Sequence, residues 1–341
     1  MAALADKLSS KVEELVEYRD TIAPLSSGKH IFEACTSIGL RPTQEDRFVL
    51  IPRLHNDECS FCGVFDGTVG DDASDYINQN IVAHLCKNLE IQSGSESGIF
   101  NIPAPEADGT PATAASTSGS VSDEVAEKLR NGIRSTFLSA DGALLEMCAG
   151  KKLHYASSTG VTAFLWKNLL TVAHIGDSKA CIARVEQGEV HPEWLTVDHK
   201  PNMPQELRRI EASGGSLAWL HGNKPYIRGG DFFKRQGLGE HPKQLNYSRA
   251  FGGKDLKMYG LSADPDISHF EITAEDKLVL LGSDGLWDVL NPRAACDIAF
   301  QARARGRSAA ADIVASVIQE MPICGVRDNI TVIAIFLNAN V

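Results

Sequence analysis

Phe61-Cys62-Gly63-Val64-Phe65-Asp66-Gly67 is an apolar, strand-like run that ends in a carboxylate and a glycine. The same arrangement recurs where the apolar run 278–283 leads into Asp284 and the run 170–176 leads into Asp177. Glu45, Asp46 and Asp328 also stand beside apolar, β-branched segments. Strands that end in carboxylates direct oxygen ligands into one shared cleft. The pattern therefore predicts β-sheets whose strand ends form an acidic site.

Carboxylates this close together cannot all stay ionised unless a cation neutralises them. Mg²⁺ or Mn²⁺ suits a site of oxygen ligands that retains waters. Asp66 is placed to bridge two ions, and Gly67, which lacks a Cβ, lets its carbonyl approach a metal closely. Two ions sharing a carboxylate would hold and deprotonate a water. Arg41, four residues before Glu45, would clamp a phosphate. These residues indicate hydrolysis of a phosphate ester without a protein nucleophile.

The composition excludes several classes of protein. The 341 residues include 33 Lys and Arg against 44 Asp and Glu, a formal net charge of −11, which argues against nucleic-acid binding. The sequence shows no signal peptide, no apolar run long enough to span a bilayer, and no glycine after Met1 for myristoylation. We expect no membrane contact and a cytoplasmic location, extending to the nucleus. Eight scattered cysteines, with Cys59 and Cys62 on opposite faces of a strand, indicate buried free thiols.

Hydrophobic periodicity divides the chain into segments. Residues 3–20 have an amphipathic pattern, typical of a helix packed on its own domain or of a partner-docking arm, and we favour the first. Residues 91–121, rich in Ser, Gly, Ala, Thr and Pro, predict a disordered insertion. The glycine-rich stretch 203–259 predicts a flap over the cleft, helical only over 205–212. We expect one domain over 28–341 after a helical extension over 1–27. The pattern further predicts helices over 72–89, 122–149, 292–304 and 308–320 and strands over 160–167, 170–174, 180–186, 277–282 and 329–337.

Short motifs follow one another along the chain: Arg41-Pro42-Thr43-Gln44-Glu45-Asp46-Arg47, Val64-Phe65-Asp66-Gly67, Ser157-Ser158-Thr159-Gly160, Gly176-Asp177-Ser178-Lys179-Ala180, Asp198-His199-Lys200-Pro201, Ser248-Arg249-Ala250-Phe251-Gly252, Asp284-Gly285-Leu286-Trp287-Asp288-Val289 and Arg327-Asp328-Asn329-Ile330-Thr331-Val332. In this order they resemble the metal-dependent protein phosphatase family, type 2C. The resemblance covers roughly residues 28–338, and it is specific as a set although each motif alone is weak.

The resemblance implies an α+β fold, a four-layer α-β-β-α sandwich of two packed, mainly antiparallel sheets flanked by helix pairs, with metals at one end. It implies a serine/threonine protein phosphatase, a monomer that acts on phosphoprotein substrates and uses two Mg²⁺ or Mn²⁺ ions and a weaker third. Asp66 would bridge the two ions. Glu45 and the carbonyl of Gly67 would bind one of them, and Asp284 and Asp328 would bind the other.

The resemblance assigns further roles around this centre. Asp177 together with Asp284 would hold the weaker third ion, and Arg41 would bind the substrate phosphate. Asp46 would lie behind the ligands and orient a water on the metal, with Asn329 also behind them.

Two positions depart from the family pattern. The family usually has His-Gly-Gly after Asp-Gly, where this chain has Thr68-Val69-Gly70. That histidine is taken as the general acid that protonates the leaving alkoxide, which threonine cannot do near neutral pH. Losing a general acid typically costs on the order of 10²–10⁴ in rate. Gly253 stands where the family usually has Asp, and we expect that residue to support the flap and not to ligate metal.

These departures leave two hypotheses open. The first is an active phosphatase with attenuated turnover, and the second is a catalytically inactive binding protein that uses the fold and the extra flap residues between His221 and Asn246 as a docking surface. We do not expect His221 or His241 to replace the missing acid. Lys200, Arg208 and Arg209 indicate a solvated helix start.

Overall fold

The computed structural model describes residues 20–27, 30–54, 59–91 and 123–338. Its strands are β1 (Asp20–Ser27), β2 (His30–Ser37), β3 (Arg47–Leu54), β4 (Cys59–Phe65), β5 (Gly67–Thr68), β6 (Ser157–Ser158), β7 (Gly160–Trp166), β8 (Leu169–Ile175), β9 (Lys179–Glu186), β10 (Glu189–Trp194), β11 (Ser216–Leu220), β12 (Lys224–Arg228), β13 (Phe251–Gly252), β14 (Asp266–Glu271), β15 (Asp276–Gly282) and β16 (Ile330–Phe336). Its helices are α2 (Asp72–Asn88), α3 (Asp123–Lys151), α4 (Pro204–Ala212), α5 (Phe232–Gly237), α6 (Lys254–Lys257), α7 (Asp284–Trp287), α8 (Pro292–Ala304) and α9 (Ala309–Cys324).

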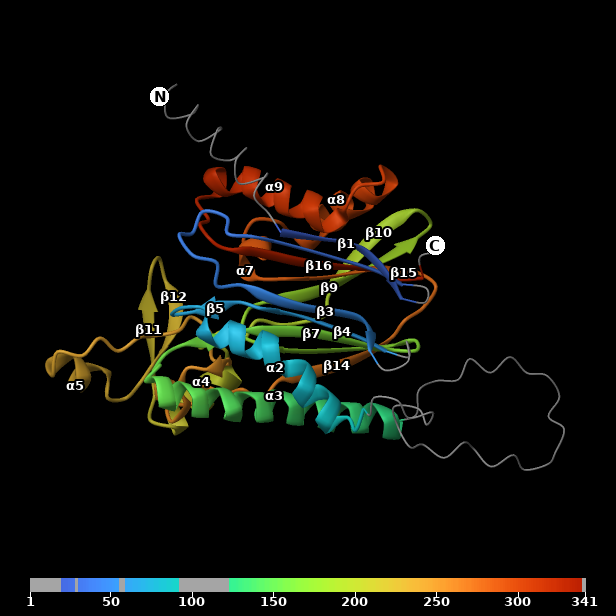
Figure 1. Ribbon diagram of the computed structural model, residues 1–341. Coiled ribbons are helices and arrows are strands. Elements are labelled where there is room, and N and C mark those ends of the chain that lie inside the picture. The colour runs from blue at the N-terminus through green and yellow to red at the C-terminus, as the bar shows by residue number, and fades with distance from the viewer. Residues whose placement is uncertain (1–19, 28–29, 55–58, 92–122, 339–341) are drawn as a thin grey trace, which may run out of the picture.

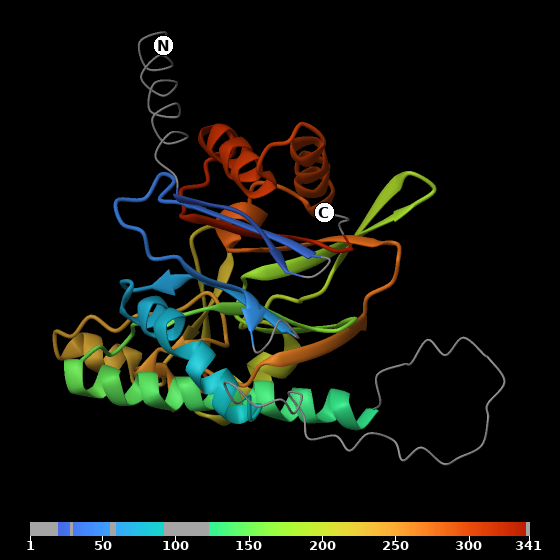
Figure 2. The ribbon, with the colours of Figure 1, turned by 45° about the vertical axis from the view of Figure 1, so that its right-hand side comes forward.

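Two antiparallel sheets form the centre of the molecule (Figure 1). One has the strand order β1-β2-β16-β15-β9-β10, and the other has the order β14-β8-β7-β4-β3. Helices α8 and α9 cover the outer face of the first sheet, and α2 and α3 cover the outer face of the second (Figures 1 and 2). This arrangement confirms the expected four-layer α-β-β-α sandwich.

Strand β4 shows why the apolar runs become buried strands. Cys59, Phe61 and Phe65 join the hydrophobic core under α2 and α3, whereas Cys62 and Val64 join the core between the two sheets. Successive side chains of a strand point to opposite faces, so a strand covered on both faces needs apolar residues at every position. All seven residues of β4 are buried for this reason. Cys59 and Cys62 therefore point apart, and none of the eight cysteines forms a disulfide. The expected burial is wrong for Cys324, which is exposed, and for Cys86, which is partly exposed.

The outer helices and the central hairpin follow the sequence prediction. The helices expected over 72–89, 122–149, 292–304 and 308–320 are α2, α3, α8 and α9. Strands β7 and β8 pair as a hairpin whose turn contains Lys167 at a φ of 57°. The apolar periodicity of these segments is strong because each packs one face or both against a core.

The N-terminal part differs from the prediction. Residues 20–27 form strand β1, which pairs with β2, and not the end of a helical extension. The amphipathic pattern ends at residue 20, and pairing with β2 at the edge of the sheet satisfies the backbone hydrogen bonds of the segment that follows. Residues 3–19 of the predicted helix, and the predicted insertion from residue 92 onward, lie outside the described residues.

The flap, residues 203–259, contains more regular secondary structure than its sequence predicts. Besides α4 it contains the hairpin β11–β12 and the short helices α5 and α6. Ile210, Ile227, Leu245 and Tyr247 belong to a small hydrophobic cluster of this region. The flap is thus ordered by contacts between distant residues, which leave no periodic pattern in the sequence.

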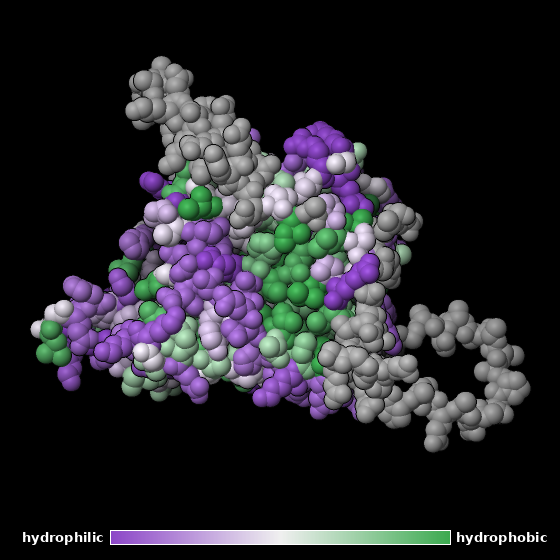
Figure 3. All heavy atoms as spheres, viewed as in Figure 1, coloured by the Kyte–Doolittle hydropathy of each residue, from purple (hydrophilic) through white to green (hydrophobic). Residues whose placement is uncertain are grey.

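The outer surface of the molecule is mixed in polarity. Figure 3 shows hydrophobic side chains gathered near the middle of one face and mostly hydrophilic ones toward the end that carries β11, β12 and α5. None of the described helices is both long and apolar enough to cross a lipid bilayer.

Candidate metal centre

A cavity of about 390 Å³ lies where β4, β8 and β15 end and β16 begins. The structure brings nearly all of the predicted site residues together in its wall, namely Arg41, Glu45, Asp66, Gly67, Thr68, Asp177, Asp284, Asp328 and Asn329. The carboxylates come from strand ends that are far apart in the sequence and adjacent in the fold. The convergence that the sequence predicts is therefore present, and its geometry can be examined residue by residue.

Asp66 joins the end of β4 to Gly67, the first residue of β5, and both residues line the cavity. Thr159 holds Asp66 from both sides, since the Asp66 amide donates to Thr159 Oγ1 at 3.3 Å and the Thr159 amide donates to the Asp66 carbonyl at 2.9 Å. A Cβ at Gly67 would meet the Glu45 carbonyl oxygen at 2.6 Å and Ser74 Oγ at 2.7 Å. Only glycine allows this close approach between the segments that carry Glu45 and Asp66.

Asp46 lies directly behind the cavity and is 2% exposed. Its Oδ2 accepts hydrogen bonds from Ser283 Oγ and Thr331 Oγ1, both at 2.8 Å. Its Oδ1 is buried and has no hydrogen-bond partner in the described part of the chain. Burial raises the pKa of Asp46 to about 7, against the lowering effect of the two hydroxyl donors. A buried carboxylate oxygen without a partner is the acceptor expected behind a water on a metal ion.

The electrostatics of the cavity also fit a cation. Burial raises the pKa of Asp66 well above its ordinary value, and repulsion from Asp46 and Asp284 adds to the rise. The pKa of Asp284 is raised in the same way by burial and by Asp177 and Asp328. Oxygen donors with surplus negative charge are what Mg²⁺ or Mn²⁺ requires. The groups that would hold the ions are Glu45, Asp66, the Gly67 carbonyl, Asp177, Asp284 and Asp328.

Asp177 is paired with a cation of the protein itself. Nζ of Lys200 forms a short ion pair with Oδ2 of Asp177. Burial would lower the pKa of Lys200, but the attraction of Asp177 outweighs it and the pKa is raised. The prediction of a solvated helix start is wrong for Lys200 and for Arg209, which donates to Glu206, and only Arg208 is exposed. Sequence reasoning missed these pairs because the partners lie on other elements or are buried.

Arg41 reaches the cavity from the loop before β3. Its Nη2 donates to Asp328 Oδ2 at 2.9 Å and its Nε donates to the Arg327 carbonyl at 2.7 Å. Asn329 fastens the same loop, because its Oδ1 accepts from the Glu45 amide at 2.8 Å and its Nδ2 donates to two loop carbonyls at 2.9 Å. The Arg41 side chain is half exposed, so its outer edge remains open to an anion.

Thr68, which stands where the resemblance implies a histidine, lines the cavity. Its hydroxyl hydrogen-bonds to the phenol of Tyr247, which also contacts Ser157 Oγ at 3.1 Å. Burial raises the pKa of Tyr247 above its ordinary value, so this phenol stays neutral. Within the described chain, neither His221 nor His241 lines the cavity.

The flap supplies cavity residues that sequence reasoning missed. Lys224 and Tyr226 on β12 line the cavity, as do residues 244–247. Hairpin β11–β12 is held in place by the Ile227 amide, which donates to the Leu245 carbonyl at 2.8 Å. A polar, aperiodic stretch gives no signal for such placement. Gly253 lies outside the cavity wall, with a φ of 62°, as a residue that begins a short helix and not as a ligand.

Comparisons with known proteins agree with one another. A family model described as Protein phosphatase 2C matches residues 32–330. A probable protein phosphatase 2C 56 of Oryza sativa subsp. japonica is 31% identical over 253 residues, which are 74% of this chain and 56% of the rice protein. A probable protein phosphatase 2C 61 of Arabidopsis thaliana is 28% identical over 344 residues, with 96% and 93% covered. The crystal structure of a serine-threonine phosphatase 2C from Toxoplasma gondii superimposes with a TM-score of 0.81 at 39% identity, covering 93% of this chain and 99% of that one.

Proposed function

Because the chain belongs to the protein phosphatase 2C family, we propose that it hydrolyses phosphoserine and phosphothreonine in proteins, with reduced turnover. The observation that carries this proposal is the cavity wall, in which the carboxylates stand in front of the unpartnered, buried Oδ1 of Asp46. A purely structural acidic cluster would be paired with basic side chains. Here Lys200 and Arg41 are the basic groups in direct contact with the proposed ligands, among the described residues.

Each residue has a defined part in the proposed reaction. Bound Mg²⁺ or Mn²⁺ would supply the Lewis acidity that activates water for attack on phosphorus. Two ions are assigned to Glu45, Asp66, Gly67, Asp284 and Asp328, and a weaker third to Asp177 and Asp284. Arg41 holds the substrate phosphate with its outer guanidinium edge. Asp46 accepts a hydrogen bond from water through Oδ1 and so orients it.

Turnover is reduced because Thr68 cannot protonate a departing alkoxide near neutral pH. General acid catalysis typically contributes on the order of 10²–10⁴ in rate. This contribution matters most for a poor leaving group such as the serine or threonine alkoxide. An aryl phosphate releases a phenolate, which departs without prior protonation, and its hydrolysis is therefore expected to suffer less.

The test measures phosphate release from a phosphothreonine peptide and from an aryl phosphate, with and without Mn²⁺. The expected result is Mn²⁺-dependent release from both, faster from the aryl phosphate, and none above background for Asp66→Asn. Absence of Mn²⁺-dependent release from every substrate, even at high protein concentration, would instead support the inactive binding protein.

A further inference from the structure

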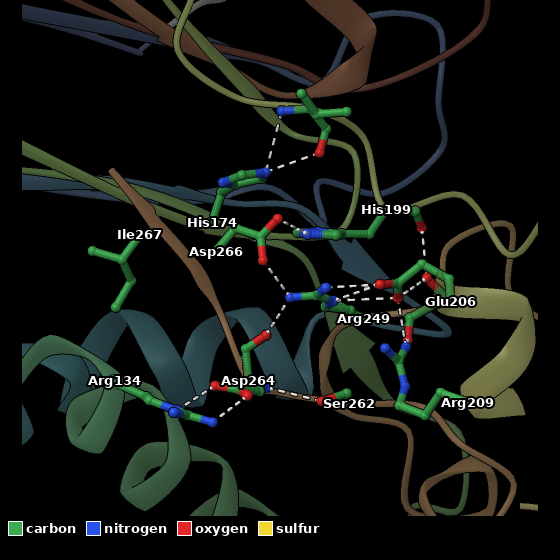
Figure 4. Close-up of polar contacts among 12 residues, drawn as sticks. Arg134, His174, His199, Glu206, Arg209, Arg249, Ser262, Asp264, Asp266 and Ile267 are labelled. Carbon is green, nitrogen blue, oxygen red and sulfur yellow. Dashed lines mark hydrogen bonds and ion pairs between the residues drawn. The ribbon is translucent and has the colours of Figure 1, made fainter. Parts of the chain in front are cut away.

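A chain of polar contacts links Glu206, Arg249, Asp266 and His199 (Figure 4). It starts at Glu206 on α4, whose Oε1 accepts from Arg249 Nη2 at 2.7 Å. Arg249 Nη1 donates to Asp266 Oδ1 at 2.7 Å, so its guanidinium joins two carboxylates on different elements. Burial would raise the pKa of Glu206, but its donors, Arg249 first among them, lower it to about 2. The Glu206 carboxylate is therefore ionised near neutral pH, and its ion pair with Arg249 persists there.

His199 is the next member and is only 3% exposed. Its Nε2 lies 3.2 Å from Asp266 Oδ2, and its Nδ1 accepts a hydrogen bond from the Gly176 amide at 3.2 Å. Its own amide donates to the Gly176 carbonyl at 2.9 Å. His199 therefore forms hydrogen bonds with both the amide and the carbonyl of Gly176, the residue immediately before Asp177.

The hydrogen bonds of His199 define its tautomer. A backbone amide can only donate, so Nδ1 presents its lone pair to Gly176 and the ring proton sits on Nε2, facing Asp266. His174, His199 and Asp266 place their donor atoms within 4.8 Å of one another, a spacing that a metal ion would also suit. Protonated Nε2 has no lone pair for a metal, and His174 Nε2 is engaged with the Val197 carbonyl at 2.9 Å. The geometry therefore supports a polar brace and not a second metal site. The brace is hydrogen-bonded from Glu206 to Asp266 and from His199 to Gly176, and Asp266 and His199 meet in a close polar contact whose geometry falls short of a hydrogen bond.

The turn at Gly176, which this brace holds, is restricted to one backbone conformation by its surroundings. Gly176 has a φ of 88°, and a Cβ there would meet Thr159 Cγ2 at 2.7 Å. Lys200, the neighbour of His199, places its ammonium on the Asp177 carboxylate. His199 therefore restrains the backbone that precedes Asp177, and Lys200 restrains the Asp177 side chain.

We propose that His199 is a positioning residue for Asp177, and that the chain Glu206–Arg249–Asp266–His199 couples the base of the flap to binding of the weaker third cation. The proposal rests on the proposed function, which assigns that cation to Asp177 and Asp284. Holding the Gly176 peptide fixes the direction in which the Asp177 carboxylate leaves the turn. Flap movements that shift α4 would reach Asp177 through this route.

Two substitutions of His199 separate its contacts. His199→Asn places a side-chain oxygen close to the position of Nδ1, so it retains the acceptor for the Gly176 amide and loses the reach to Asp266. His199→Gln reaches toward Asp266 and offers no acceptor at the Nδ1 position. Calorimetric titration of the full chain with Mn²⁺ measures the number of ions and the affinity of each, and thermal melts verify that each variant is folded.

We expect His199→Gln to weaken the weakest Mn²⁺ site about 10-fold or more, as loss of a ligand-orienting hydrogen bond typically does, and to leave the two tighter ions unchanged. His199→Asn keeps this hydrogen bond and loses only the contact with Asp266, so it should weaken the weakest site less than His199→Gln does and by about as much as Asp266→Ala. Equal weakening by both variants, or no change in either, would overturn the proposal.

A second pair of variants covers the case in which His199→Gln does not fold. Asp266→Asn keeps an acceptor for the Nε2 proton and should bind Mn²⁺ as the parent does, whereas Asp266→Ala frees the imidazole and should weaken only the third ion. Identical affinities in these two variants would count against the proposal. A parent protein that binds no Mn²⁺ at all would contradict the proposed function itself, so the two failures remain distinct.

Discussion

Val69 follows Thr68 at the rim of the cavity, with a φ of 64° and a side chain that is 44% exposed. A β-branched side chain in this left-handed region crowds its own backbone, at a cost of roughly 1–2 kcal/mol. The amide of Gly70 donates to Glu45 Oε2 at 3.2 Å, which helps to hold the turn in this shape. The strain therefore lies beside a proposed metal ligand, where surrounding contacts maintain it.

Val69→Gly is expected to raise the free energy of unfolding by about 0.5–1 kcal/mol, because strain relief exceeds the entropic cost of glycine. Urea denaturation measures this change. Gln187→Gly, at a φ of 51° in the β9–β10 turn, is the control for an unbranched residue and should gain less. A loss of stability at position 69 would show that the valine side chain makes contacts that outweigh its strain.

Thr68→His tests the missing acid directly. We expect turnover on a phosphothreonine peptide to rise by about 10²-fold, and turnover on an aryl phosphate to rise much less, because only the alkoxide needs a proton. Thr68→Asn is the matched control, since it adds a polar side chain of similar reach without an acid. The explanation fails if both variants change turnover on the peptide equally, or if neither does.

Among the elements, the α2–α3 pair depends on one glycine for its close packing. A Cβ added at Gly132 of α3 would meet Leu89 Cδ2 at 2.3 Å and the Asn88 carbonyl oxygen at 3.2 Å, where α2 ends. Gly142, ten residues further along the same helix, has no atom within 4 Å of the corresponding position. The two glycines therefore differ in their surroundings and not in their helix.

Gly132→Ala is expected to destabilise the protein by about 1–3 kcal/mol through overpacking. Gly142→Ala should instead stabilise it by about 0.5–1 kcal/mol, since alanine is the better helix former. Chemical denaturation of both variants gives the comparison. Equal effects at the two positions would mean that α2 and α3 are not packed as described.

Across the whole molecule the formal net charge is −11, and the carboxylates that line the cavity set the response to metal and pH. Burial raises the pKa values of Asp66 and Asp284 well above the ordinary value of an aspartate carboxyl, so the metal-free fold binds these protons more tightly than the unfolded chain does. Stability of the metal-free protein therefore falls as pH rises from 3.8 through the raised values. Cations take over the role of these protons.

Removal of metal with EDTA is accordingly expected to lower Tm more at about pH 8 than at about pH 5.5, where protonation compensates in part. Thermal melts with Mn²⁺ or EDTA at both pH values measure the difference. Asp66→Asn carries one charge less and should show a smaller metal effect and a weaker dependence on pH. Equal EDTA effects at the two pH values in the parent protein would contradict this account.

Much of the fold was predictable from residues near one another in the chain. The run that ends in Asp66 predicts a strand because a strand buried on both faces must be apolar throughout, and β4 is such a strand. The order of the acidic motifs predicts their convergence, and the cavity contains them. Local burial patterns and the steric freedom of Gly67 are properties of short segments, so the sequence alone reveals them.

Tertiary structure alone decided the rest. The flap has no periodic pattern, yet Ile227 and Leu245 bring Lys224 and Tyr226 to the cavity. The pairing of Lys200 with Asp177, and the brace through His199 to Gly176, join residues that are 23 apart in sequence. The free energy of burying a charged side chain depends on which protein group replaces the water molecules that it loses. Only the folded chain determines that group.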